Sequence, residues 1–584
     1  MDVTTRVPPQ PGDTRVPLDG GGLTLPALIR LAEGAAVPVV DPGALERVRR
    51  AHGTADRLAA TGRWYGRGTG VGAHRSVAVD PAEETAHGLR LLRSHAGGAG
   101  PLLPARTVRA MLAIRANQLL AGGSGIHPSF VTALTDALRL GVHPAVNEYG
   151  GVGTGDLTAL AQTGLTLLGE RPWLTPEDAP GSPAAVPGGG VLSEERPPAG
   201  AGALGAVGAL GVGAVGAGAE QATLAAADLT GTVDGAHVGE ARPRGVGAGV
   251  GAGTGDGDLA AGGLPAPVTL RAGDALALLS SNALALAQAA LAGHGTELLL
   301  RATHVVAALS LAAVSGSPEA YAAPVHALRP YPGPARAAAE VRRLLGLPDD
   351  PATGVGNGPP AADRRIQDPY GFRAFPQVHG AALDASAALR RIVETEINCP
   401  SENPVLTPEG HLYHHGGFFA APLALALDGL NLALLKTAQL SAARLSALSR
   451  PDLTGLPAFL ATGPAGSSGT MILEYTANSA LAELRAGAAA PASAGHAVLS
   501  HGLEEAAGFA GQAARQTERA RAAYATVLAC ELVSAVRALR LHPEPPALPA
   551  LTLAAAVLPT GLEDRPLTGD IETATELLPR LAEL

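Results

Sequence analysis

A glycine-rich turn that leads directly into a strongly patterned helix is the first candidate for a reaction centre in this sequence. The segment from Glu148 to Glu170 reads EYGGVGTGDLTALAQTGLTLLGE. Its apolar face is expected to gather Leu157, Leu160, Ala161, Gly164, Leu165 and Leu168. Asp156 is placed to cap the start of this helix and Gly169 to end it. The positive end of the helix dipole would then point at the three residues before Asp156, which are Gly153, Thr154 and Gly155.

A second group of polar side chains has the chemistry to bind a carboxylate. Gln367, Tyr370 and Arg373 lie within the stretch RRIQDPYGFR at residues 364–373. The planar guanidinium of Arg373 can donate two parallel hydrogen bonds to an α-carboxylate. A surface arginine beside a tyrosine, without a ligand, is the alternative interpretation.

Two other patterns do not predict a cofactor. His411, His414 and His415 are close in sequence, but no Asp, Glu or Cys accompanies them at the spacing of metal ligands. The stretch Gly211–Gly216 spells a dinucleotide-binding pattern without a credible strand before it or helix after it. We therefore expect neither a metal nor a nucleotide.

The turn and its continuation resemble the histidine and aromatic amino acid ammonia-lyase family. In that family, an Ala-Ser-Gly triplet before the same Gly-Asp-Leu sequence cyclises into an electrophilic methylidene-imidazolone. Here Gly153 stands in place of the alanine, Thr154 replaces the serine, and Glu148 and Asp156 enclose seven residues where the family has eight. Dehydration of Thr154 would leave an extra methyl group on the electrophilic carbon, and a glycine at 153 preorganises the turn less. The resemblance implies a ring built from Gly153, Thr154 and Gly155, and these departures disfavour it.

The resemblance also implies a catalytic base. Residues 64–72, WYGRGTGVG, are similar to the family's tyrosine loop, in which a phenol removes the β-proton of the substrate. Tyr65 is the corresponding residue. A phenol that acts as a base needs a pKa lowered by nearby cations or helix termini. A tyrosine packed against a flexible loop is the structural alternative.

Two further matches imply a polar, imidazole-like substrate. His95, in the stretch LRSHAGG, is similar to a residue that lines the side-chain pocket in histidine-preferring members. Glu504 matches the glutamate that faces the imidazole in those enzymes. The alternatives are a structural histidine at 95 and, at 504, an exposed helix carboxylate paired with Arg515.

Other site segments depart from the family. Ser280 replaces an asparagine that holds the ring or the substrate amine, and Asn282 could substitute for it only if the helix start shifts by two residues. Phe418 keeps the aromatic pocket residue, whereas glycine replaces the asparagine before it. The candidate catalytic residues are Tyr65, Gly153, Thr154, Gly155 and Tyr370. The candidate substrate-binding residues are His95, Ser280, Asn282, Gln367, Arg373, Phe418 and Glu504.

Hydrophobic periodicity predicts a mostly α-helical protein. The strongest helical patterns lie at residues 108–120, 274–291, 378–392, 422–448 and 503–539. The resemblance implies an all-α subunit of the fumarase/aspartase-like ammonia-lyase type, with a long central bundle and a loop-rich N-terminal region. We divide the chain into an active-site region at 1–173, a Gly/Ala/Pro-rich flexible insertion at 174–267, a bundle at 268–540 and a helical tail at 541–584.

Composition excludes several classes of protein. The 584 residues carry a formal net charge of −10, which argues against nucleic acid as a partner. Cys399 and Cys530 are too few for a disulfide framework, and the first residues lack an apolar signal core. Apolar stretches such as Phe418 to Leu427 are broken by Asp428, Asn431 and Lys436, so no membrane span is expected. We expect a cytoplasmic enzyme, and the resemblance implies a homotetramer whose active sites combine three subunits.

Three functions remain open on the residues alone. We favour elimination of ammonia from an α-amino acid, histidine first and an aromatic amino acid second. An aminomutase of the same family, which returns the ammonia to the neighbouring carbon, would carry the same residues. A homologue without the ring, which performs other chemistry or only binds an amino-acid-like ligand, would explain the substitutions at Thr154 and Ser280.

Overall fold

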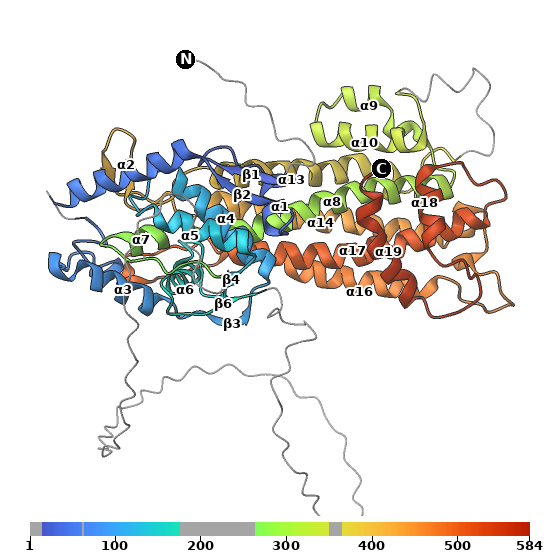
Figure 1. Cartoon of the computed structure of the whole chain (residues 1–584). Helices are drawn as coiled ribbons and strands as arrows, with labels where there is room; N and C mark the ends of the chain where they lie inside the picture. Colours follow the sequence, from blue (N-terminus) through green and yellow to red (C-terminus); the bar gives the residue numbers. More distant parts are fainter. Residues whose placement is uncertain (1–13, 61–63, 176–262, 350–364) are drawn as a thin grey trace, which may run out of the picture. The chain divides into compact units, whose positions relative to one another are not determined.

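The chain folds mainly into α-helices, as its periodicity predicts (Figure 1). The structure is a computed structural model that describes residues 14–60, 64–175, 263–349 and 365–584. All described residues belong to one compact unit. The predicted insertion at 174–267, including Gly211–Gly216, lies outside the described residues except at its two ends.

Short helices and two-residue to four-residue strands form the N-terminal region. Its helices are α1 (Leu25–Ala32), α2 (Pro42–Ala59), α3 (Glu84–His95), α4 (Ala105–Leu120), α5 (Ser129–Leu140) and α6 (Leu157–Leu167). Its strands are β1 (Arg15–Leu18), β2 (Val37–Val40), β3 (Ala99–Leu102), β4 (His143–Pro144), β5 (Asn147–Tyr149) and β6 (Trp173–Leu174). β1 and β2 pair in parallel, and the pairs β3–β5 and β4–β6 are antiparallel.

Long helices dominate the remainder of the described chain. They are α8 (Ala283–Ala313), α10 (Pro332–Leu345), α13 (Phe375–Glu396), α14 (Ala421–Leu448), α16 (Met471–Ala488) and α17 (Ala510–Leu541), and the six-residue helix α7 (Asp274–Leu279) precedes α8. The shorter elements are α9 (Ala323–Ala327), α12 (Tyr370–Arg373), α15 (Pro451–Thr454), α18 (Pro549–Val557), α19 (Thr568–Leu581), and the antiparallel pair β7 (Val405–Leu406) and β8 (Leu412–Tyr413).

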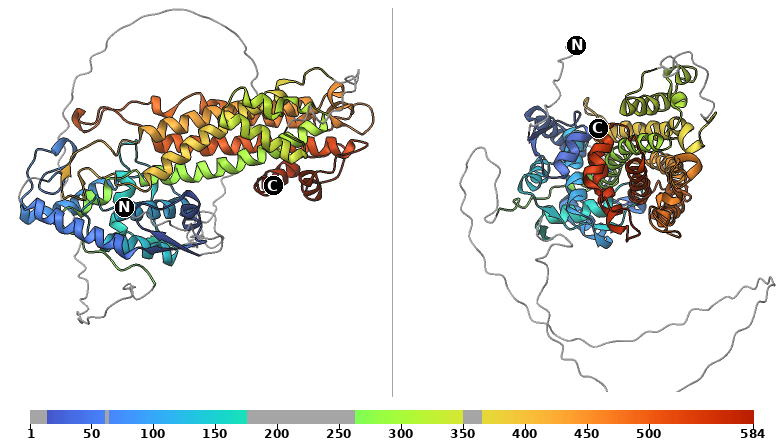
Figure 2. Two further views of the ribbon diagram at one scale, coloured as in Figure 1. Left: turned by 90° about the horizontal axis from the view of Figure 1, so that it is seen from above. Right: turned by 90° about the vertical axis from the view of Figure 1, so that its right-hand side faces the viewer.

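The bundle is built around α17, which packs extensively against both α8 and α14 (Figure 2). α16 packs on α14 and α17, α13 packs on α14 and α10, and α19 packs on α17 and α8. The facing surfaces are rich in alanine and leucine, so the helix backbones can approach closely. Two predicted helices have different bounds from those expected: the 274–291 helix is broken at residues 280–282, and the 503–539 helix begins only at Ala510.

By length and composition alone, three helical stretches are long and apolar enough to cross a membrane. They are Asp274–Ala313, Ala421–Leu448 and Ala510–Leu541. Asp428, Asn431 and Lys436 lie within α14 without ending it. In the bundle, 83%, 56% and 83% of the most apolar windows of these stretches are buried, so packing between the helices accounts for their composition.

A fully buried ion pair joins α14 to α17. The guanidinium of Arg444 donates from Nε to Glu531 Oε1 at 2.6 Å and from Nη2 to Oε2 at 2.8 Å. Ser310 of α8 and Ser441 of α14 donate to the same carboxylate. Arg444 also donates to the carbonyl of Gly371, which fixes α12 to this part of the bundle. Each charge is thus paired and hydrogen-bonded, as burial requires.

Removing one partner of this pair should destabilise the bundle strongly. Glu531→Ala leaves the Arg444 guanidinium buried without its counter-charge, and we expect the free energy of unfolding to fall by about 3–5 kcal/mol. Urea unfolding followed by circular dichroism measures this. Asp452→Ala, which breaks the exposed Arg450–Asp452 pair, is the control and should leave the unfolding midpoint unchanged. Equal midpoints for the two variants would contradict the assigned role.

Two buried imidazoles lie beside this pair. The rings of His304 (α8) and His379 (α13) meet edge to face with centroids 4.5 Å apart. Burial, aided by Arg336, lowers the pKa of His304 to about 3. Burial, aided by His304 and Arg444, lowers the pKa of His379 well below its usual range. Both rings are therefore neutral in the folded protein at neutral pH.

These histidines should make the bundle sensitive to acid. Since the unfolded chain binds protons at an ordinary histidine pKa near 6.5 and the folded chain does not, stability falls as the pH drops below about 6.5. His304→Leu removes the contribution of one histidine to this acid sensitivity. Between pH 6.5 and 5, the free energy of unfolding of the variant should therefore fall by about 2 kcal/mol less than that of the wild type. Unfolding curves at both pH values measure this difference, and parallel losses in the two proteins would refute it.

Candidate active site

The turn at residues 152–156 lies where the N-terminal ends of four helices meet. α6 begins at Leu157, directly after it. The backbone N–H of Ala420, which precedes α14, donates to the Gly153 carbonyl at 3.2 Å, and the N–H of Phe509, which precedes α17, donates to the Val152 carbonyl at 2.8 Å. The positive ends of these helix dipoles therefore converge on the turn, where the sequence predicted only that of α6.

The fourth helix, α8, reaches the turn through Asn282. Asn282 is the N-cap residue of α8. Its Oδ1 accepts a hydrogen bond from the Gly155 N–H at 3.0 Å, and its Nδ2 donates to the carbonyl of Phe418. The helix break at 280–282 moves the start of the long helix to Ala283. This is the two-residue shift that allows Asn282 to take the place of the family's asparagine, where this chain has Ser280.

A buried network holds this break in place. Arg115 of α4 is fully buried and donates to the carbonyls of Ala277 and Leu278, which end α7. Its Nη1 pairs with Glu402 Oε1 at 2.8 Å. Ser401 Oγ, next to Glu402, donates to the Ser280 carbonyl at 3.2 Å. Sequence reasoning missed Arg115 and Glu402, because their separation of 287 residues hides the pairing.

Asp156 plays a different part from the predicted one. It occupies the N-cap position of α6, but its side chain makes no capping bond there. Instead its carboxylate accepts from the Ala285 N–H at 2.8 Å and so caps α8. Burial raises the pKa of Asp156 to about 6, against the lowering effect of the Ala285 and Leu284 N–H groups. The prediction of Gly169 as the helix stop is confirmed, since it has φ +82° and follows the last turn of α6.

The backbone of the turn does not fit the ring that the family forms. Gly153 has φ +87°, and a Cβ added to it would lie 2.6 Å from the Phe509 nitrogen, so alanine has no room there. Gly155 has φ +112°, and its nitrogen is bonded to Asn282. With threonine at 154 in addition, the residues present do not match a methylidene-imidazolone, and we derive no chemical step through that group.

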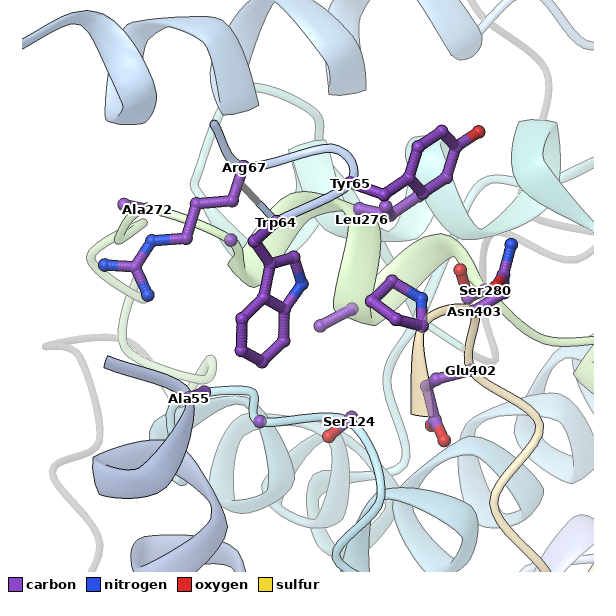
Figure 3. Close-up of a pocket in the computed structure, with 14 residues that line it drawn as sticks. Ala55, Trp64, Tyr65, Arg67, Ser124, Ala272, Leu276, Ser280, Glu402 and Asn403 are labelled. Atoms are coloured by element: carbon purple, nitrogen blue, oxygen red, sulfur yellow. The ribbon is translucent and has the colours of Figure 1, made fainter. Parts of the chain in front are cut away.

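Tyr65 lies in a turn beside α7, close to Leu276 of that helix (Figure 3). Its phenol oxygen accepts from the Gly72 N–H at 2.8 Å. Gly72 is in close contact with Ser500, so the tyrosine loop and the 499–504 loop pack together. In Figure 3 the rings of Trp64 and Tyr65 point to different sides of their loop.

The structure does not by itself supply the lowered phenol pKa that a base at Tyr65 requires. Burial raises the pKa of Tyr65 above its ordinary value. The Gly72 N–H acts in the opposite direction, the Glu504 carboxylate adds to the rise, and Arg75 opposes it. A phenolate at this position therefore needs a further positive charge close by, which a bound substrate can supply.

The remaining nearby candidates lie on three segments around the turn. His95 ends α3, and its Nδ1 is 2.9 Å from the Leu91 carbonyl; the chain after it contacts the start of α6 at Thr158. The carbonyl oxygen of Phe418 accepts a hydrogen bond from the side-chain amide of Asn282. Glu504 lies in a loop, not on a helix, and the predicted alternative partner Arg515 pairs with Glu148 at 3.1 Å instead.

The structure does not bring the carboxylate-binding group to the turn. Arg373 stacks on Tyr370, with its guanidinium carbon 4.3 Å from the ring centroid, and Tyr370 is 67% exposed. α12 is bonded through Gly371 to Arg444, 23 residues along α14 from Ala421. At 1.5 Å per residue that is about 35 Å from the turn. Gln367, Tyr370 and Arg373 of one chain therefore cannot act on a substrate held at the turn of the same chain.

The three neighbouring histidines have separate surroundings. His415 Nε2 lies 2.6 Å from the Glu402 carbonyl oxygen, and its backbone N–H donates to Asn403. The ring of His414 meets the Tyr65 ring edge to face at 6.2 Å. Within the described ranges, no group of three His, Cys, Asp or Glu residues is placed to hold a metal ion.

Cavities of very different size adjoin the site. The space between Tyr65, Ser280 and Glu402 (Figure 3) has about 20 Å³, room for little more than one water. A cavity of about 710 Å³ is lined by Glu148 and by the second turns of α8 and α17, at Gln288 and Arg515. The larger one is of ligand size.

Comparison with known proteins agrees with this architecture. The sequence model of the family described as aromatic amino acid lyase matches residues 23–191 and 212–558. A histidine ammonia-lyase of Anaeromyxobacter sp. (strain K) is 32% identical over 577 residues, which cover 96% of this chain and 98% of that protein. That of Symbiobacterium thermophilum is 31% identical over 566 residues, 96% of each chain.

Solved structures share the fold. Histidine ammonia-lyase from Trypanosoma cruzi superposes with a TM-score of 0.75 at 25% identity, covering 97% of this chain and 95% of that one. Tyrosine aminomutase from Streptomyces globisporus gives 0.77 at 24% identity over 97% of both chains. Ergothionase from Treponema denticola gives 0.77 at 24% identity over 98% and 100%.

The predicted all-α fold is confirmed, and the family model together with the histidine ammonia-lyase relatives identifies a carbon–nitrogen lyase of the ammonia-lyase type. The chain belongs to the aromatic amino acid lyase family. Its function is ammonia-lyase-like.

The conformation of Gly153 provides a test of the turn's geometry. Gly153→Ala places a methyl group against the Phe509 nitrogen in a left-handed backbone, and we expect it to lower the free energy of unfolding by about 1–3 kcal/mol. Gly416→Ala is the matched control, since a Cβ there meets nothing within 4 Å. Chemical denaturation compares the two. If Gly153→Ala is as stable as Gly416→Ala, the described turn is wrong.

Proposed function

We propose that this protein eliminates the α-amine of an amino acid with an imidazole or aromatic side chain, with histidine as the first candidate. Tyr65 is the base that removes the β-proton. His95 and Glu504 face the side chain of the substrate, and Asn282 and Phe418 line the side of the turn. The curated relatives described above are histidine ammonia-lyases, which supports this substrate.

The observation that carries the proposal is that Tyr65 and the Glu504 loop pack together beside the turn at which four helix N-termini meet. Elimination moves electron density from the β-carbon towards the nitrogen. Positive helix ends stabilise such density as it develops, and they do so more in the transition state than in the ground state.

A second copy of the chain completes the site in this proposal. Arg373 is the carboxylate ligand, with Gln367 and Tyr370 beside it. Because these residues lie about 35 Å along α14 from the turn of their own chain, the Arg373 that acts at a given turn belongs to another subunit. This reasoning favours a homotetramer with composite sites.

Two inactivating variants should rescue each other if the site is shared. Tyr65→Phe removes the base and should lower kcat by about 10²- to 10⁴-fold, and Arg373→Ala should be similarly impaired through loss of the bidentate carboxylate contact. Each variant alone is assayed for amine release from histidine and aromatic amino acids. Co-expressed, they should form mixed oligomers in which some sites combine an intact Tyr65 with an intact Arg373.

Recovery of activity well above the sum of the two variants is the expected result. A mixture of separately purified, unexchanged oligomers is the control and should stay inactive. If co-expression restores nothing while both variants assemble normally, the site does not combine Tyr65 and Arg373 from different chains.

A further inference from the structure

The loop that carries Tyr65 has a sequence with unusual backbone freedom. Glycine occupies every second position from Gly66 to Gly72, and glycine restricts the backbone less than any other residue. The phenol oxygen of Tyr65 accepts from the Gly72 N–H at 2.8 Å, and this donor belongs to the same loop. That hydrogen bond orients the ring relative to the loop, but it does not attach the loop to the helices around it.

Arg67 attaches the loop to two helices. Its Nη1 donates to Asp56 Oδ1 at 2.9 Å, and its Nε donates to Glu84 Oε2 at 2.9 Å. Asp56 lies in the last turn of α2, and Glu84 is the first residue of α3. The side chains of Arg67 and Glu84 are 15% and 14% exposed, so water screens this ion pair less than it screens pairs at the surface.

The backbone carries this attachment to Tyr65, two residues before Arg67. The Arg67 N–H donates to the Trp64 carbonyl at 3.1 Å, which closes a turn around Tyr65. Gly66 in this turn has φ +74°, and a Cβ added to it would lie 2.1 Å from Leu276 Cδ2, so the turn lies directly against α7. A shift of Arg67 would therefore move the peptide that bears the phenol.

The Arg67 side chain does not share the position of the Tyr65 ring. In Figure 3 the two side chains extend to different sides of their loop. The stem of Arg67 passes Gly273, where an added Cβ would lie 3.3 Å from Arg67 Cδ. An effect of Arg67 on the reaction must therefore pass through the loop.

We propose that Arg67 is a positioning residue, whose ion pairs with Asp56 and Glu84 hold the loop so that the Tyr65 phenol stays within reach of the substrate's β-proton. This inference rests on the proposed function, in which Tyr65 is the base, and it adds a residue outside the substrate-binding set. A base acts only from hydrogen-bonding distance of the proton that it removes. A misplacement of about 1 Å can lower the rate by about 10²-fold.

Hydrogen exchange tests the attachment without requiring turnover. Arg67→Gln removes the charge that joins α2 and α3 to the loop, and we expect backbone amides in peptides covering residues 64–79 to exchange about 10-fold faster. Arg90→Gln, which breaks the exposed Arg90–Glu83 pair near the start of α3, is the matched control and should leave this exchange unchanged. Equal exchange in Arg67→Gln and the wild type would overturn the inference.

Kinetics of the full-length protein separate positioning from a general loss of structure. For amine release from the best amino acid substrate, Arg67→Gln should lower kcat by about 10- to 100-fold, with KM changed by less than about 3-fold. Arg67→Lys keeps the charge and can still pair with one carboxylate, so we expect a smaller loss of kcat. Arg90→Gln should retain the wild-type kcat.

A double variant shows whether Arg67 acts through Tyr65. In a Tyr65→Phe background the base is already absent, so adding Arg67→Gln should lower the residual rate by less than about 2-fold. Equal losses in the two backgrounds would overturn the inference and leave the lyase function standing. A wild-type protein that releases no amine from histidine or the aromatic amino acids would instead contradict the proposed function.

Discussion

The hydrogen bonds of Asn282 hold together the segments on which the candidate site depends. One side chain fixes the turn through Gly155 and the loop before α14 through Phe418, and it does so from the N-cap position of α8, a long helix of the bundle's core. It can do this only because α7 and α8 are separate helices. The break between them is held by the buried Arg115–Glu402 pair, so a charge pair in the interior sets the position of an amide at the surface of the site.

A second buried ion pair, at a distant point of the same bundle, positions the other group of candidate site residues. Arg444 and Glu531 tie α14 to α17 and, through the Gly371 carbonyl, position the short helix that carries Arg373. The rigid helices between the two pairs keep the turn and Arg373 apart within one chain. A lyase that needs both groups must then take them from different copies, and the bundle is the spacer that sets their relative positions.

Sequence patterns predicted the fold well because helical periodicity is a local property. The helices at 108–120, 378–392 and 422–448 agree with α4, α13 and α14 to within a few residues at most boundaries. The break at 280–282 was missed because three polar residues, Ser280, Ser281 and Asn282, are too short an interruption of the apolar pattern to predict a helix end. Hydrogen bonds from Arg115 and Ser401, which are distant in sequence, stabilise the break. Asp156 was placed correctly as an N-cap position, but the helix that it caps is 129 residues away in sequence.

The site was predictable in its residue types and less so in its arrangement. Tyr65, Asn282, Phe418 and Glu504 were named from the resemblance, and the structure places all four near the turn or its supporting loops. The backbone N–H groups of Ala420 and Phe509 could not be predicted to contact the turn. Nearly every residue has a backbone N–H, and only the tertiary fold determines which of them point at the turn. The direction of the Tyr65 pKa also depends on burial and on Glu504, which no local pattern reveals.

The central claim is that the turn at Gly153, Thr154 and Gly155 remains a linear peptide in a functional lyase. The mass of the peptide spanning Glu148 to Asp156, measured on purified and catalytically active protein, tests this most directly. We expect the mass of the unmodified sequence. Loss of two water molecules from this peptide, the sum of cyclisation and dehydration, would contradict it and would restore the electrophile as the source of activation.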